Sequence, residues 1–141
     1  MSTDRPRLDQ LNIVVSDMDR SLAFYRLLGV DTPQLSRISD QLQHANASVD
    51  GFGLDFDSPA FAATWNRGWA GRADLAGRVV VGFKLAERDE VDRMYARLTG
   101  EGHRGLQPPY DAVWGARYAV VEDPDGLAIG LMSPIEAPPP G

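Results

Sequence analysis

Apolar positions in the first thirty residues change from a strand pattern to a helix pattern. Residues 8–17 read LDQLNIVVSD, and the β-branched run 13–15 predicts a strand. Ser16 and Asp17 follow it as candidate helix N-caps. In the next segment, DMDRSLAFYRLLGV, the apolar residues recur at helical spacing, and Gly29 is suited to end the helix. This part of the chain is therefore expected to form a strand followed by a helix.

The same order of patterns returns 70 residues later. The segment RVVVGFKLAERDE predicts a strand that runs into an acidic helix start, and VDRMYARLTG follows with helical spacing. Under this shift Tyr25 aligns with Tyr95, and strand and helix keep the same register. The chain therefore contains an internal repeat. The periodic apolar positions of the second helix are Val91, Met94, Tyr95 and Leu98.

Short strand patterns follow each predicted helix, so each half is expected to be β-α-β-β-β. This predicts an α+β fold, with residues 1–141 as one domain of two tandem modules. The modules span about 8–57 and 78–133, with a connector at 58–77 and a proline-rich tail at 134–141, which is expected to fray. The expected short strands are 34–38, 42–48 and 51–57 in the first half, and 104–107, 117–122 and 127–132 in the second.

Composition excludes several classes of function. The 141 residues carry a net charge of −6 and no run of Lys or Arg, which argues against nucleic-acid binding. The absence of cysteine excludes disulfides, thiolate metal sites and cysteine nucleophiles. The polar start MSTDRPRLDQ and the lack of a long apolar run predict a soluble, cytoplasmic protein that does not enter a membrane.

Two segments carry a family resemblance. LDQLNIVVSDMDRSLAFYRLLG together with WGARYAVVEDPDGLAIGLM resembles the vicinal oxygen chelate superfamily, and the likeness extends over about residues 8–133. That group includes glyoxalase I, extradiol dioxygenases, fosfomycin-resistance enzymes and bleomycin-resistance proteins. The resemblance implies two β-α-β-β-β modules that form a curled, cup-like mixed sheet. It also implies a homodimer with pockets at or near the subunit boundary.

The resemblance implies four metal-ligand positions, one on the first and one on the last strand of each module. The first-strand positions here are Gln10 and Val80; the last-strand positions are Gly130 and either Leu54 or Asp55. Val80 and Gly130 have no side-chain donor, whereas divalent catalytic ions generally need about three protein ligands. We therefore expect neither a metal nor another cofactor at this site. A displaced site built from His44, Gln10 and Asp55 is the metallic alternative; the other histidine, His103, matches no ligand position.

A metal-free cup is still a cavity that can bind a small molecule. Its inward face is expected to carry Gln10, Asn12 and Val14 from the first module, and Val80, Gly82 and Lys84 from the second. Gly130 has two interpretations. Either it lets a planar molecule approach the backbone, or it makes room for a large neighbouring side chain.

Aromatic residues are expected in connector and loop segments, where recognition residues tend to lie. Trp65 and Trp69 stand one helical turn apart; they are candidates for stacking on a planar ligand or for packing between modules or subunits. Asp55, Asp57 and Glu122 are candidates for an anionic lip that attracts cations. The predicted ligand-binding residues are Gln10, Asn12, Asp55, Trp65, Trp69, Val80, Tyr110, Trp114, Arg117 and Gly130.

Three functions follow as hypotheses. The first is metal-independent binding or sequestration of a small aromatic molecule, as the resemblance to bleomycin-resistance proteins implies. The second is an enzyme of the lyase, isomerase or dioxygenase type, with a displaced metal or with Asp55 or Glu122 as a metal-free acid–base catalyst. The third is a regulatory interaction module.

Overall fold

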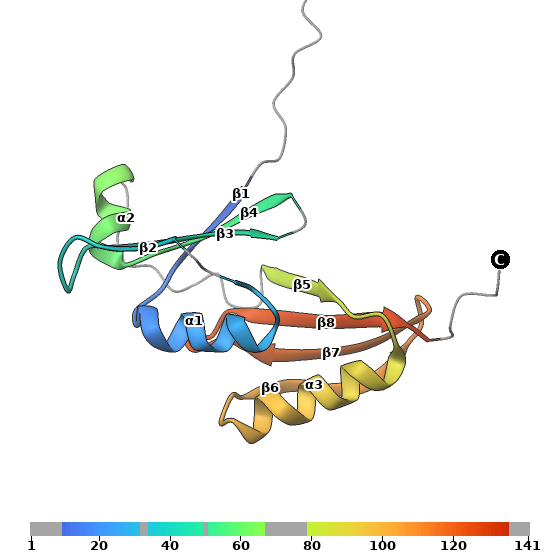
Figure 1. Cartoon of the computed structure of the whole chain (residues 1–141). Coiled ribbons are helices and arrows are strands. Elements are labelled where there is room, and N and C mark those ends of the chain that lie inside the picture. Colours follow the sequence, from blue (N-terminus) through green and yellow to red (C-terminus); the bar gives the residue numbers. More distant parts are fainter. Residues whose placement is uncertain (1–9, 32–33, 50, 67–78, 136–141) are drawn as a thin grey trace, which may run out of the picture. The chain divides into compact units, whose positions relative to one another are not determined.

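The computed structural model describes residues 10–31, 34–49, 51–66 and 79–135. The chain forms two compact units, unit 1 (residues 1–71) and unit 2 (residues 72–141) (Figure 1). Each unit holds a four-stranded mixed sheet whose first strand is followed by a helix and three further strands. The predicted α+β fold with two β-α-β-β-β modules is confirmed.

In unit 1 the strand order is β1-β4-β3-β2, so the first strand of the module pairs with the last one (Figure 1). β1 runs parallel to β4, and the other neighbours are antiparallel. The elements are β1 (Gln10–Val14), α1 (Met18–Leu27), β2 (Gln34–Arg37), β3 (Gln43–Val49), β4 (Phe52–Asp57) and α2 (Pro59–Trp65).

The unit 1 sheet has one apolar and one polar face, because side chains alternate along each strand. On β4 the apolar face carries Leu54 and Phe56, both buried, and the ring of Phe56 lies 4.8 Å from that of Tyr25 on α1. Asp55 and Asp57, which alternate with these residues along β4, point to the opposite face. The helix-covered side therefore forms the core, and the polar side is available for a site.

Local sequence signals explain where the unit 1 helices begin and end. Asp17 caps α1 by accepting a hydrogen bond from the backbone nitrogen of Arg20, and Gly29 follows its end with φ of 85°, both as predicted. Helix α2 was not predicted, since 58–77 was expected to be a connector. Ser58 caps it and Pro59 occupies its first turn. Within the described ranges, no helix has the length and apolar character that crossing a membrane requires.

Unit 2 repeats this arrangement, with strand order β5-β8-β7-β6 and α3 packed on the sheet. Val91 and Leu98 of α3, two of the predicted periodic positions, are fully buried. Ile129 and Leu131 of β8 supply the sheet side of this core. The elements are β5 (Val80–Lys84), α3 (Arg88–Gly100), β6 (Gly105–Ala112), β7 (Ala116–Glu122) and β8 (Ala128–Pro134).

The sixth strand is longer than predicted. We expected residues 104–107, whereas β6 extends to Ala112 and includes Pro108 and Pro109. The register with β7 shifts on both sides of Gln107, and β6 is an edge strand. Bulges and edges are the places where a sheet tolerates proline, because no ladder hydrogen bond is lost there. Tyr110 therefore lies on a strand, and its predicted loop position is wrong.

Candidate functional site

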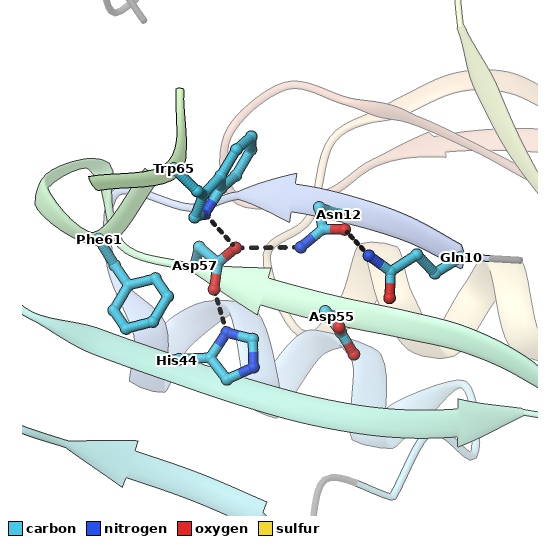
Figure 2. Close-up of a pocket in the computed structure, with 7 residues that line it drawn as sticks. All are labelled: Gln10, Asn12, His44, Asp55, Asp57, Phe61 and Trp65. Carbon is cyan, nitrogen blue, oxygen red and sulfur yellow. Dashed lines mark hydrogen bonds and ion pairs between the residues drawn. The ribbon is translucent and has the colours of Figure 1, made fainter. Parts of the chain in front are cut away.

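A cavity of about 400 Å³ opens on the polar face of the unit 1 sheet (Figure 2). Small-molecule sites typically measure roughly 300–1,000 Å³. Four of the predicted ligand-binding residues lie together here, although they come from β1, β4 and α2. The lining residues are Gln10, Asn12, His44, Asp55, Asp57, Phe61 and Trp65.

Strand register brings the polar residues together. His44 on β3 lies opposite Asp57 on β4, and Asn12 on β1 lies opposite Asp55. Residues directly opposite each other in a sheet point to the same face. The pairing of three strands therefore gathers two carboxylates, an imidazole and an amide at one place.

Asp57 is the centre of a hydrogen-bond network. Its side chain is 0% exposed. Its Oδ2 accepts hydrogen bonds from Asn12 Nδ2 and Trp65 Nε1, both 3.1 Å long, and its Oδ1 contacts Nδ1 of His44 (Figure 2). Gln10 Nε2 donates in turn to Asn12 Oδ1 at 3.0 Å. We call these five residues the Asp57 network. They supply the partners that a buried carboxylate needs.

Asp55 and the aromatic residues complete the lining. Asp55 is 8% exposed and accepts a long hydrogen bond of 3.5 Å from Asn46 Nδ2. Phe61 of α2 stacks on the His44 ring, with 5.0 Å between centroids and 23° between planes. Trp65, on the same helix, also lines the cavity and is 49% exposed. The cavity thus combines negative charge with two flat apolar surfaces.

The register also identifies the fourth metal-ligand position that the resemblance implies. Asn12 pairs with Asp55 in unit 1, and Gly82, its equivalent under the 70-residue shift, pairs with Gly130 in unit 2. Asp55 is therefore the counterpart of Gly130, whereas Leu54 points into the core.

These positions do not fit the metal that the resemblance implies. Only Gln10 and Asp55 carry oxygen donors, because Val80 and Gly130 have none. The described part of the chain also holds no group of three His, Asp or Glu side chains that could bind an ion. Nδ1 of His44 contacts Asp57. The displaced site from His44, Gln10 and Asp55 stays a prediction, since these three residues line one cavity.

Gly130 is covered by side chains of its own unit. A Cβ atom at this position would lie 2.9 Å from the hydroxyl of Tyr118 and 3.2 Å from Cγ1 of Val80. Gly130 itself is buried. This favours the packing interpretation of the glycine over the alternative, in which a ligand approaches the backbone.

Tyr118 connects the predicted site residues of unit 2. Its ring centroid lies 6.3 Å from that of Tyr110 and 5.5 Å from that of Trp114, both in edge-to-face arrangements. Trp114 lies in the turn between β6 and β7 and is 57% exposed. Tyr118 was not among the predicted site residues, but four that were lie around it. We call this group the Tyr118 cluster: Tyr118, Val80, Tyr110, Trp114 and Gly130.

Arg117 lies apart from that cluster, on the face of β7 that α3 covers. Its Nε donates to Asp92 of α3 at 3.0 Å, and its guanidinium also bonds Asp111 of β6 at 3.2 Å. These contacts tie the helix to the edge strand. Trp69, the remaining predicted ligand-binding residue, lies outside the described residues.

Sequence reasoning missed part of this cavity. It did not select Phe61, because the helix that carries this residue was not predicted. It considered His44 as a candidate metal ligand and Asp57 as a charge at the lip, and it did not connect the two residues. The available signal for α2 was the pair Ser58-Pro59, a capping residue followed by a proline suited to a first helical turn.

Known structures share this fold. A glyoxalase/bleomycin resistance protein/dioxygenase from Nocardioides is 25% identical, with TM-score 0.71, over 99% of this chain and 91% of that chain. A glyoxalase-related enzyme from Fulvimarina pelagi gives TM-score 0.77 at 19% identity, over 90% of this chain and 87% of that one. A glyoxalase/bleomycin resistance protein/dioxygenase family enzyme from Burkholderia phytofirmans PsJN gives TM-score 0.74 at 16% identity, over 92% of this chain and 100% of that chain. Among curated proteins, none matches the chain.

A family model gives the same result from sequence. The model of the Glyoxalase/Bleomycin resistance protein/Dioxygenase superfamily matches residues 7–131, which is most of the chain. The two modules and their pairing of first with last strand agree with that match. The chain belongs to the glyoxalase/bleomycin resistance protein/dioxygenase superfamily.

Proposed function

We propose that the protein binds a small planar organic molecule, neutral or cationic, in the unit 1 cavity and without a metal ion. The observation that carries this proposal is the cavity on the polar face, with the Asp57 network at its base and two aromatic side chains at its side. A ligand-binding role for these residues is favoured over a purely structural one. Gln10, His44 and Trp65 are accessible to solvent, and the Asp57 network holds their side chains in place.

Charge and shape indicate the ligand class. Asp55 and Asp57 bring two carboxylates to a site with one imidazole, so an anion is disfavoured. Asp55 retains accepting capacity, because an ionised carboxylate offers about four lone-pair positions and Asn46 uses one. Phe61 and Trp65 provide surfaces for stacking on a flat ring. A planar cation or a neutral hydrogen-bond donor meets these conditions.

A titration with paired probes tests the proposal. Protein treated with a chelator is titrated by calorimetry with 9-aminoacridine, a planar cation, and with 9-anthracenecarboxylate, an anion of similar shape. We expect saturable binding of the cation to one site per chain. We expect the anion to bind at least about tenfold more weakly, which corresponds to about 1.4 kcal/mol. Equal affinity for both probes, or no binding of either, would refute the proposal.

Matched variants locate the site of binding. Asp55→Asn keeps the shape of the side chain and removes its charge, so we expect it to weaken binding of 9-aminoacridine about tenfold. Trp114→Phe, in the Tyr118 cluster of unit 2, is expected to leave the affinity unchanged. If Trp114→Phe weakens binding and Asp55→Asn does not, the cavity of unit 1 is not the binding site.

The proposal also includes the homodimer that the family resemblance implies and a cytoplasmic location. Light scattering on the purified protein tests the first, and fractionation of cells that express it tests the second. Neither result alters the argument for the cavity, since all its lining residues belong to one unit of one chain.

A further inference from the structure

His44 and Asp57 have the arrangement of a general base and the carboxylate that orients it. Nδ1 of His44 lies against Oδ1 of the fully buried Asp57. The other oxygen of that carboxylate is held by Asn12 and Trp65, so its orientation is fixed. A neutral imidazole that donates from Nδ1 to a carboxylate carries its lone pair on Nε2.

The second ring nitrogen is placed where a ligand can reach it. Figure 2 shows it turned away from Asp57, and His44 lines the cavity with its side chain 20% exposed. Stacking on Phe61 fixes the plane of the ring. A histidine with only a packing role does not need an accessible nitrogen. The accessible edge of this ring is therefore available for chemistry.

The cavity around His44 holds two carboxylates: Asp57 contacts Nδ1 of the ring, and Asp55 lines the same space. The same two carboxylates disfavour an anionic substrate, and the walls formed by Phe61 and Trp65 favour a flat one. The chemistry that fits is removal of a proton from a neutral or cationic, planar, conjugated carbon acid.

We propose that the unit 1 cavity is a metal-independent proton-transfer site in which Nε2 of His44 is the general base. His44 takes a proton from carbon, the electron pair of the C–H bond moves into the conjugated system, and the imidazolium returns the proton to another atom of the substrate or to water. Asp57 acts as a positioning residue. This inference rests on the proposed function in one respect: substrate must occupy the same cavity.

A planar probe with a single acidic C–H group tests the inference. In 5-nitrobenzisoxazole a base removes the ring C–H proton, a carbon–nitrogen triple bond forms and the N–O bond breaks, so the ring opens to a single coloured cyanophenolate. We expect the full chain, in chelator, to convert it faster than free imidazole at equal concentration. His44→Asn keeps an N–H group in the place of Nδ1 but lacks the base. We expect this variant to lower kcat/KM by about a hundredfold or more.

Three controls separate a catalytic role from a structural one. His103→Asn changes the other histidine, which precedes β6 in unit 2, and should leave the rate unchanged. Added imidazole should restore turnover to His44→Ala, which a merely structural role would not allow. Thermal unfolding of each variant shows whether the fold is retained. Equal rates for wild type and His44→Asn, or a wild-type rate no faster than free imidazole, would overturn the inference.

The probes also separate this inference from the proposed function. If the protein binds 9-aminoacridine but does not convert 5-nitrobenzisoxazole, the proton-transfer role is overturned and the proposed binding function stands. Turnover that depends on His44 without any binding of 9-aminoacridine would support the base and refute the proposed preference for cations.

Discussion

Replacing Asp57 by alanine is expected to lower the free energy of unfolding by about 3 kcal/mol. The variant removes a fully buried acceptor and leaves the donors of Asn12 and Trp65 without their partner. A hydrogen bond to a charged group contributes roughly 1.5–3 kcal/mol, and here two part-buried donors and the His44 contact lose the same carboxylate. Urea unfolding followed by circular dichroism measures the loss.

Asp55 provides a matched control on the same strand and face, two residues away. It is nearly as buried, at 8% exposure, but its hydrogen bond from Asn46 is long, at 3.5 Å. Asp55→Ala should therefore cost less than about 1 kcal/mol. Equal losses for the two alanine variants would mean that Asp57 does not organise the cavity, and the account of the site would fail.

Gly130→Ala is expected to destabilise unit 2 by about 1–3 kcal/mol, the usual cost of overpacking a core. The added Cβ would lie 2.9 Å from the hydroxyl of Tyr118 and 3.2 Å from Val80, so both side chains must move. Gly82 is the matched control, since it pairs with Gly130 on the neighbouring strand and a Cβ there meets nothing within 4 Å. Gly82→Ala should leave stability unchanged or raise it slightly.

A second substitution identifies which neighbour causes the loss. Tyr118→Phe removes the hydroxyl that lies closest to the added Cβ, so the double variant with Gly130→Ala should recover about half of the lost stability relative to Tyr118→Phe alone. Thermal unfolding of the wild type, the two single variants and the double variant completes this double-mutant cycle. If Gly130→Ala is as stable as wild type, Tyr118 does not fill the space above the glycine, and the ligand interpretation of Gly130 returns.

The sequence allowed the repeated modules and their main elements to be predicted, because those depend on local patterns. The first helix has a capping aspartate, Asp17, and a terminating glycine, Gly29, while α3 has the buried positions Val91 and Leu98 at helical spacing. The strand predictions were accurate except for β6. There Pro108 and Pro109 obscured a strand that a bulged edge permits.

The Asp57 network was harder to predict, because it depends on register across strands. One signal was present: residues 49–52 read VDGF, and Asp-Gly between two strand patterns predicts a two-residue hairpin turn. Counting outward from that turn places His44 opposite Asp57, which is the pairing observed. The hydrogen bond from Trp65 had no such signal, since it requires the position of a helix relative to the sheet.

The side chains that contact Gly130 are a second feature that could not be predicted from the sequence. The resemblance indicated that this position lacks a ligand side chain, but it did not indicate what replaces it. Tyr118 lies on the adjacent strand, where β7 residue Val120 pairs with Gly130, so the tyrosine reaches the glycine diagonally. Such a diagonal contact depends on a side-chain rotamer as well as on register, and neither is encoded in a local pattern.

The most direct measurement of metal-independent binding is one titration performed in two conditions. Chelator-treated protein, with its metal content measured by elemental analysis, is titrated with 9-aminoacridine, first without added ions and then with Zn²⁺, Ni²⁺ or Mn²⁺. The account predicts saturable binding to metal-free protein, with a Kd that the ions leave within about twofold, since Val80 and Gly130 offer no donors. Binding that appears only when an ion is added would contradict it.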